Sequence, residues 1–242
     1  MVNYPRILIG APQSDKKRYC FDAWAQNILD LSYPKENIDV FLADNSDTPE
    51  FCEHIKSKYG FGCVHIPKNG RDIRLVMAEC HEEVRKKAIS GNYDYLFHLE
   101  TDVFPPIDGL LSLLWSKKDI VSGMYHIFQG ASRTLMVQQM ESNPFDDDKT
   151  IFTALPEQSC LILDGTTKEV YHAGLGAILI RKKVLNKFKF RYEQGEDAHP
   201  DTFFCKDINS FTRFKININT NVMCFHWNTN SWNTIKWNKK LR

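Results

Sequence analysis

Short apolar runs alternate with amphipathic segments through the first half of the chain. The clearest helical pattern lies at 71–89, where apolar side chains recur at spacings of three and four. The run Tyr95–Leu99 is apolar almost throughout, which is typical of a strand in a sheet covered on both faces. The pattern predicts strands at Arg6–Gly10, Ile38–Ala43, Cys63–Ile66 and Tyr95–Leu99, helices at Cys20–Leu31, Glu50–Tyr59 and Arg71–Ile89, and a loop at Ala11–Lys17.

This order of strands and helices predicts a Rossmann-like α/β fold with a mostly parallel sheet flanked by helices. The second half is less regular, and we expect it to add a smaller antiparallel region. No repeat or linker interrupts the chain, so we expect residues 1–242 to form a single domain with a polar tail at 228–242. In the second half we predict helices at Ile107–Trp115 and Thr202–Phe211, strands at Ile120–Met124, Ser132–Met140, Ser159–Leu163, Gly176–Arg181, Ile216–Ile218 and Val222–Phe225, and a loop at Glu141–Lys149.

Charge and composition exclude several classes of partner. The 31 basic and 30 acidic residues give a net charge of +1, too little to draw the protein onto nucleic acid. No stretch approaches the roughly 20 apolar residues of a membrane helix, and the polar start Met1–Arg6 does not resemble a signal peptide. The seven cysteines form no C-x-x-C pair, and most lie among apolar residues and are predicted to be buried thiols, which favours a reducing, cytoplasmic compartment. The oligomeric state is left open.

The strongest chemical signal is a pair of acids directly after the apolar run at 95–99. Glu100 and Asp102 flank Thr101, and alternate residues of an extended chain point the same way. Ligands of open parallel sheets bind at the carboxyl ends of strands, and carboxylate oxygens there suit Mg²⁺ or Mn²⁺. The alternative is a solvated loop whose acids cap the next helix.

Four weaker signals lie elsewhere. Arg71 and Arg74 are three positions apart at a predicted helix start, which suits an anion such as phosphate, unless both are simply solvated. Asp44 and Asn45 end the second strand, where an acid can bind a ribose or form an Asx turn. Asp201 precedes a helix and is either a functional acid or an N-cap. His226 follows a short strand and is either a ligand or a packed side chain.

Taken in order, these residues resemble family 2 and related glycosyltransferases of the GT-A fold, from about Ile7 to His226. The resemblance implies a nucleotide-binding half at about 1–105 and an acceptor-binding half at about 106–227. Glu100-Thr101-Asp102 resembles the Asp-x-Asp metal motif, with Glu in place of the first acid. The resemblance implies Asp102, His226 and, with less support, Glu100 as metal ligands, and it places Ala11, Pro12, Asp44, Asn45, Arg71, Arg74, Glu100 and Thr101 at the nucleotide sugar.

Two further segments resemble the acceptor side of that family. Gly174-Leu175-Gly176 is similar to its glycine-rich segment, where glycine lets the backbone approach sugars closely. Asp201 with Phe204-Cys205 resembles its Glu-Asp-x-x-Phe-Cys motif, whose Asp is the catalytic base. Pro200 replaces the Glu of that motif, and a true Glu-Asp pair at Asp197 is the alternative base.

The resemblance implies an inverting transferase that uses Mn²⁺ or Mg²⁺ to move a sugar from a nucleotide-diphosphate sugar, UDP favoured, to a hydroxyl of a carbohydrate acceptor. A sugar-phosphate nucleotidyltransferase is a weaker alternative, because the loop after Gly10 lacks the glycine-rich sequence that cradles a triphosphate. A non-catalytic module that binds a glycan or a nucleotide sugar is a second alternative. Glu100 and Pro200, which depart from the family's motifs, keep it open.

Overall fold

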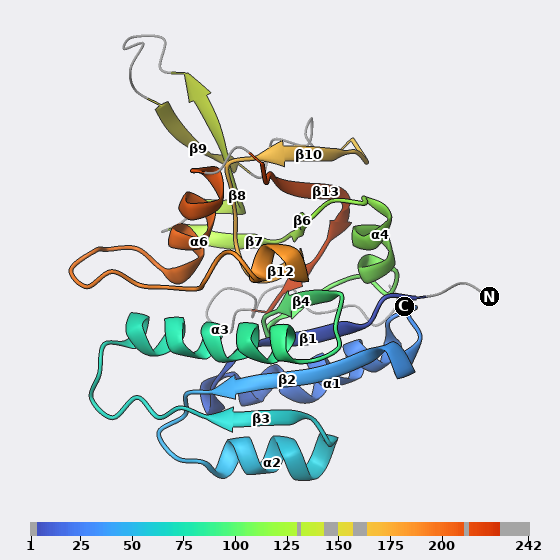
Figure 1. Cartoon of the computed structure of the whole chain (residues 1–242), viewed down its shortest axis with the longest axis vertical. Coiled ribbons are helices and arrows are strands. Elements are labelled where there is room, and N and C mark those ends of the chain that lie inside the picture. The colour runs from blue at the N-terminus through green and yellow to red at the C-terminus, as the bar shows by residue number, and fades with distance from the viewer. Residues whose placement is uncertain (1–3, 130–131, 143–149, 157–163, 211–212, 228–242) are drawn as a thin grey trace.

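The computed structural model describes residues 4–129, 132–142, 150–156, 164–210 and 213–227 (Figure 1). The predicted strand Ser159–Leu163 and the polar tail at 228–242 lie outside these residues, as does most of the predicted loop Glu141–Lys149.

An eight-stranded sheet forms the centre of the described part of the chain (Figure 1). The strands of the first half pair in parallel, β1 with both β2 and β4, and β2 with β3. In the second half, β12 is antiparallel to β4 and to β6. The predicted α/β class, with a mostly parallel sheet, is therefore confirmed. The strand order is β10 (Thr167–Val170), β13 (Ile216–Met223), β6 (Ile120–Met124), β12 (Ala177–Arg181), β4 (Tyr95–Leu99), β1 (Ile7–Gln13), β2 (Ile38–Asp44) and β3 (Gly62–His65).

Helices cover both faces of this sheet, because its buried strands carry apolar side chains on both sides. Leu8 of β1 packs into one cluster with α3 (Ile73–Ser90), α5 (Lys182–Leu185) and α6 (Pro200–Asn209). Its neighbours Ile7 and Ile9 pack into the other cluster, with α1 (Arg18–Asp30), α2 (Glu50–Tyr59) and α4 (Gly109–Trp115). The alternation of side chains along one strand thus supplies both cores.

The second half adds two small antiparallel sheets, which confirms the expected antiparallel region. One contains β11 (His172–Ala173), β8 (Ser132–Ser142), β7 (His126–Gln129) and β9 (Thr150–Pro156), of which β8 and β9 project from the body (Figure 1). The other pairs β14 (Phe225–His226) with β5 (Val103–Phe104). The strands β5, β7, β9, β10 and β11 were not predicted, and β13 is one strand where two short ones were expected.

Two predicted boundaries are wrong in ways that matter for the site. The first strand does not end at Gly10, because β1 keeps pairing with β2 as far as Gln13. Ala11 and Pro12 are therefore strand residues, not loop residues. The helix α3 begins at Ile73, since the Asp72 carboxylate caps it by accepting a 2.8 Å hydrogen bond from the Arg74 backbone. Arg71 lies before the helix, so it does not share a helical turn with Arg74.

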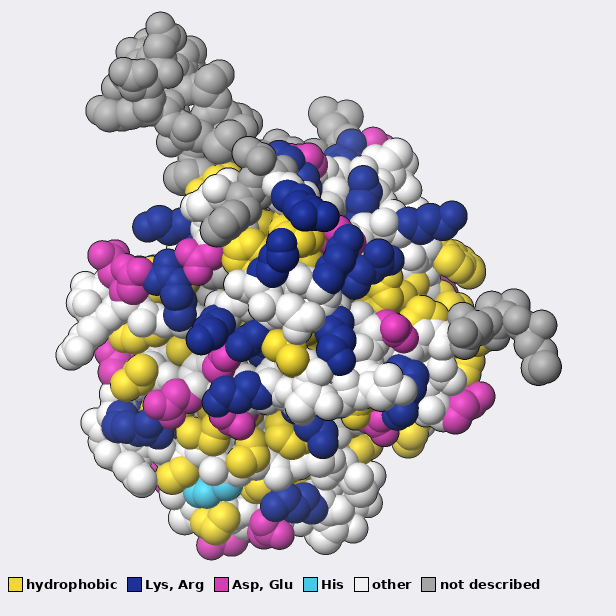
Figure 2. Space-filling view, viewed as in Figure 1, with side chains coloured by type: hydrophobic (Ala, Val, Ile, Leu, Met, Phe, Trp, Pro, Cys, Tyr) yellow, Lys and Arg dark blue, Asp and Glu magenta, His cyan; other side chains and the backbone are white. Residues whose placement is uncertain are grey.

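Charge is mixed on the surface. On the face shown in Figure 2, Lys and Arg side chains gather over the middle and upper part, and Asp and Glu lie both among them and towards the margins. Among the described residues, no helix has the length and apolar character needed to cross a membrane. The described cysteines are buried and form no disulfide with one another.

Candidate active site

Two adjoining cavities lie where the parallel strands end. The larger, about 410 Å³, is formed by the end of β1, the residues after β2 and the first turns of α3. The smaller, about 210 Å³, lies between α3, the residue after β4 and the start of α6. Met77 of α3 lines both. Ligands of parallel sheets bind at this edge, so the two cavities together are the candidate site.

An acid–base cluster stands between the cavities. The Lys17 ammonium donates a 2.9 Å hydrogen bond to Asp102 Oδ1 and lies 3.6 Å from Glu100 Oε2. Lys17 lines the larger cavity and Glu100 the smaller one. The acid pair that the sequence analysis singled out therefore faces a lysine that it did not identify.

His226 completes this cluster from the far end of the chain. The pairing of β14 with β5 sets His226 opposite Val103, next to Asp102. His226 Nε2 then lies 3.5 Å from Asp102 Oδ2. The Trp227 backbone amide donates a 2.7 Å hydrogen bond to the Asp102 carbonyl and fixes the approach of the two segments. The structure thus brings together Glu100, Asp102 and His226.

The pKa values of this cluster reflect burial and close charges. Burial raises the pKa of Glu100, and the Lys17 ammonium opposes that rise. Burial alone would raise the pKa of Asp102 too, but hydrogen bonds and charges from His226 and Lys17 lower it to about 2. Burial would lower the pKa of His226, yet the Asp102 carboxylate outweighs it and raises that pKa. Asp102 is therefore ionised at neutral pH and attracts cations.

The donor set at Asp102 suits a divalent cation. His226 Nδ1 donates a 2.8 Å hydrogen bond to the His126 carbonyl, so in the neutral ring the Nε2 lone pair faces Asp102. An imidazole nitrogen and carboxylate oxygens are ligands that Mn²⁺ accepts. Among the described residues no three His, Cys, Asp or Glu side chains are already grouped as a metal site. In this structure the positive charge at the acids comes from Lys17.

Only some of the residues predicted to bind the nucleotide line the larger cavity. Pro12 and Asn45 line the larger cavity. Ala11, Asp44 and Thr101 are buried behind its wall, all with no exposed surface. The Asp44 carboxylate accepts a 2.6 Å hydrogen bond from the Ser46 hydroxyl, and burial raises its pKa. Asp44 therefore shapes the loop that lines the cavity, as an Asx turn does, and its carboxylate is not presented to it.

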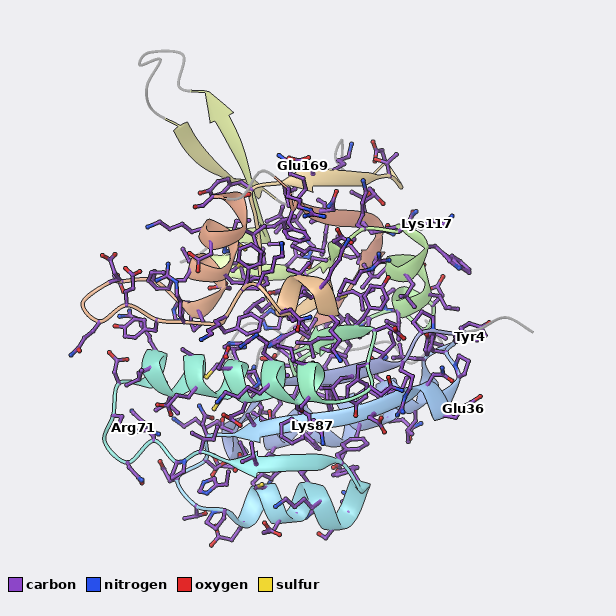
Figure 3. The ribbon with its side chains drawn as sticks, in the orientation of Figure 1. Tyr4, Glu36, Arg71, Lys87, Lys117 and Glu169 are labelled. Carbon is purple, nitrogen blue, oxygen red and sulfur yellow. The ribbon has the colours of Figure 1, made fainter. Side chains whose placement is uncertain are left out.

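The two predicted anion-binding arginines are engaged elsewhere. Arg71, labelled in Figure 3 before α3, donates to both oxygens of Glu79 at 2.8 and 2.7 Å. Arg74 forms an ion pair with Asp197. Neither arginine lines a cavity; the basic residues that line the larger one are Lys16, Lys17 and Lys68. Lys16 and Lys17 follow β1 directly at the carboxyl edge, and that position was the signal for finding them.

The two candidate bases occupy different environments. Asp201 does not precede the helix as predicted, because α6 begins at Pro200 and its N-cap is His199. The Asp201 side chain lines the smaller cavity and is 15% exposed, and its Oδ2 lies 3.8 Å from His172 Nε2. Asp197 has a 93% exposed side chain, pairs with Arg74 and does not line the cavity. Of the two candidate bases, Asp201 is the one whose side chain lines the cavity.

The glycine-rich segment borders the same cavity through Leu175. A Cβ atom on Gly174 would lie 2.2 Å from the Tyr125 hydroxyl oxygen, and one on Gly176 would lie 2.5 Å from the Tyr125 ring. The Gly176 amide donates a 3.0 Å hydrogen bond to that hydroxyl. The sequence analysis expected these glycines to let the backbone approach a sugar closely. In the structure they make room for Tyr125, which itself lines the cavity.

Comparison with known proteins gives matches in structure alone. No protein-family model matches the chain, and no curated protein matches it in sequence. GalNAc-T7, solved with UDP, GalNAc and Mn²⁺, matches with a TM-score of 0.61 and 11% identity over 93% of this chain. S. aureus TarS 1–349 matches with a TM-score of 0.54 and 9% identity over 91%. This chain spans 44% and 60% of those two chains. Both are GT-A glycosyltransferases, and this protein has a GT-A, glycosyltransferase-like fold.

Proposed function

We propose that this protein is a metal-dependent, inverting glycosyltransferase that moves a sugar from a nucleotide-diphosphate sugar, preferably a UDP sugar, to a carbohydrate hydroxyl. The observation that carries the proposal is the position of Asp102. It follows the buried strand β4 and contacts Lys17 and His226 between two cavities, one lined by lysines and the other by Asp201.

The larger cavity suits the nucleotide diphosphate. Its volume of about 410 Å³ falls in the range of small-molecule sites. Lys16, Lys17 and Lys68 place positive charge at its wall, which favours an anionic diphosphate. The side-chain amide of Asn45 offers hydrogen bonds to the nucleoside.

Asp102 and His226 would hold the divalent cation, with Glu100 as a further ligand. The ion would supply Lewis-acid stabilisation of the departing diphosphate. GalNAc-T7, solved with UDP and Mn²⁺, shares the fold and supports this choice of cofactor. Lys17, which neutralises the same acids here, contributes positive charge beside the diphosphate.

Asp201 is the proposed base. The acceptor oxygen would attack the anomeric carbon while the bond from that carbon to the phosphate oxygen breaks. Asp201 would take the hydroxyl proton, and the nucleoside diphosphate would leave towards the larger cavity. Attack on the face opposite the leaving group inverts the anomeric configuration. A positioned base of this kind contributes roughly 10²–10⁴-fold to the rate.

The test is binding followed by turnover. UDP, GDP and dTDP sugars are screened with Mn²⁺ for a rise in melting temperature, because only ligands of the native state raise it. The donor that binds is then incubated with candidate saccharide acceptors, and nucleoside diphosphate release and the product anomer are measured. Binding without any turnover would instead identify a non-catalytic nucleotide-sugar-binding module. Formation of a nucleotide sugar from triphosphate and sugar-1-phosphate would identify a nucleotidyltransferase.

A further inference from the structure

Two buried histidines form a hydrogen-bonded chain beside the smaller cavity. His81 of α3 is 3% exposed, and His98 of β4 has no exposed surface. His81 Nδ1 lies 2.8 Å from His98 Nε2, and His98 Nδ1 lies 2.5 Å from the Leu175 carbonyl oxygen. None of these contacts takes part in the chemistry proposed above.

The chemistry of the partners fixes which ring nitrogens carry protons. A carbonyl oxygen only accepts, so His98 Nδ1 must donate to Leu175. Both rings are buried, and these contacts join them to each other and to a carbonyl oxygen, with no ion pair to a carboxylate of the described residues that would compensate a positive charge, so both rings are neutral. His98 Nε2 is therefore an acceptor, and His81 Nδ1 donates to it. This leaves His81 Nε2 with a free lone pair.

That lone pair is available to a ligand. His81 lines the smaller cavity. Its Nε2 has no hydrogen-bond partner among the described residues, and it is not one of the fully buried polar atoms that lack a partner. Phe190 packs on both imidazoles, with ring centroids 5.3 Å from His81 and 6.0 Å from His98. The His81 ring is thus held in one orientation before any ligand binds, which reduces the entropy lost on binding.

The smaller cavity is lined by hydrogen-bond-accepting groups together with apolar surface. Glu100 and Asp201 are its acidic walls, while Met77, Tyr125 and Leu175 supply apolar contact. A sugar offers several hydroxyl donors and apolar C–H faces, which complements this lining. Met77 lines this cavity and the proposed nucleotide cavity, so the smaller cavity lies next to the place where a bound nucleotide sugar would carry its sugar.

We propose that His81 Nε2 accepts a hydrogen bond from one hydroxyl of the donor's sugar and so selects which sugar is transferred, with His98 as the residue that positions it. This inference rests on the proposed function, since it requires a nucleotide sugar in the two cavities.

The first test compares UDP and UDP-glucose binding to the wild type and to His81→Phe, by titration calorimetry with Mn²⁺. We expect UDP affinity to stay within about twofold and UDP-glucose affinity to fall about 3- to 10-fold, the value of one neutral hydrogen bond. An equal ratio of the two affinities in both proteins overturns the inference and leaves the proposed function intact. A wild type that binds neither UDP nor any nucleotide sugar overturns both. A change confined to the acceptor KM overturns the assignment to the donor.

The second test needs no variant and covers the case in which His81→Phe does not fold. In ¹⁵N-histidine-labelled wild type at pH 7, we expect both rings to show protonated Nδ1 and unprotonated Nε2. UDP-glucose should shift the His81 Nε2 resonance, while UDP alone and UDP-glucose lacking one hydroxyl should not. If every singly deoxygenated donor produces the same shift as UDP-glucose, His81 accepts no hydrogen bond from a sugar hydroxyl and the proposal is wrong. A protonated His81 Nε2 would equally contradict the proposal.

Discussion

The Lys17 ammonium donates a 2.9 Å hydrogen bond to Asp102 Oδ1 across 85 positions of sequence. It thereby neutralises the carboxylate that is also 3.5 Å from His226 Nε2. Any divalent ion that binds Asp102 must compete with this ammonium. The contact between Lys17 and Asp102 therefore sets the metal affinity of the free protein, and it can be tested directly.

Replacing Lys17 should strengthen metal binding in the absence of nucleotide. In Lys17→Gln, Glu100 and Asp102 keep their charges but lose the cation between them. Two unit charges 4 Å apart interact by about 4 kcal/mol at an effective dielectric constant of 20. Solvent screens part of this because both Lys17 and Glu100 are 29% exposed. We expect Mn²⁺ to bind about tenfold more tightly, measured by calorimetric titration.

A surface lysine provides the control for that comparison. Lys56 pairs with Glu53 on the exposed side of α2, so Lys56→Gln should leave Mn²⁺ affinity unchanged. If Lys17→Gln bound Mn²⁺ no better than this control, Asp102 would not be a metal ligand, and the metal-dependent part of the proposed function would have to be abandoned.

Asp102→Asn should remove both metal response and turnover. The amide loses the charge that attracts the ion and leaves Lys17 and His226 without their carboxylate partner. We expect the Mn²⁺-dependent rise in melting temperature to vanish and the transfer rate to fall by roughly 10²–10³-fold, the usual cost of losing one electrostatic stabiliser. Thermal scans with and without Mn²⁺, together with the rate of UDP release, measure the two effects.

The matched control for Asp102→Asn is Asp22→Asn. Asp22 pairs with Lys58 at the surface, with a 74% exposed side chain. It should keep the wild-type metal response and rate. A Mn²⁺-dependent stabilisation that survives in Asp102→Asn would place the ion elsewhere.

The two candidate bases can be separated by the same conservative change. Asp201→Asn removes the carboxylate that lines the smaller cavity, and we expect kcat to fall about 10²–10⁴-fold with donor affinity nearly unchanged. Asp197→Asn disturbs only an exposed pair with Arg74, so its rate should stay within about twofold. Steady-state kinetics with saturating donor measure both. The reverse ranking would move the base to Asp197.

Sequence reasoning located the acid pair because its signal is local. An apolar strand that runs straight into Glu100 and Asp102 can be read from seven or eight neighbouring residues, and the parallel half follows from the same kind of pattern. The approach of His226 to Asp102 was implied only by resemblance. The strands that create it, β5 and β14, are two residues each, too short to leave a hydrophobic period.

The lysine and the histidines were missed for other physical reasons. The sequence analysis predicted that the first strand ends at Gly10, so it placed Lys17 in a loop. In the structure β1 runs to Gln13, and Lys17 lies one turn beyond the sheet edge. The cap at Asp72 could have been recognised as an Asp directly before the apolar periodicity of α3. The burial of His81 could not have been predicted, because the residue lies between the apolar and the charged face of the helix, where a histidine can be either buried or exposed.

The neutral histidine pair should make stability depend on pH. The pKa of His98 is about 4 in the folded protein because burial penalises the charged ring, against 6.5 when unfolded. A pKa lowered by folding gives stability that is present above pH 6.5 and is lost as pH falls towards 4, because the unfolded chain then binds the proton more readily. The loss for this one group is about 3 kcal/mol. Chemical denaturation from pH 7.5 to 4.5, in buffer without metal or nucleotide, measures it.

Other groups also titrate in this range, so the informative quantity is the difference between wild type and His98→Gln. That difference in unfolding free energy should be largest above pH 6.5 and shrink steadily towards pH 4.5, since the variant has no imidazole to protonate at this position. A difference that stayed constant with pH would mean that folding leaves the pKa of His98 unchanged, and a difference that grew towards pH 4.5 would mean that the folded protein holds the charged ring. His81 would then not be held as an acceptor, and the sugar-reading role assigned to it would lose its physical basis.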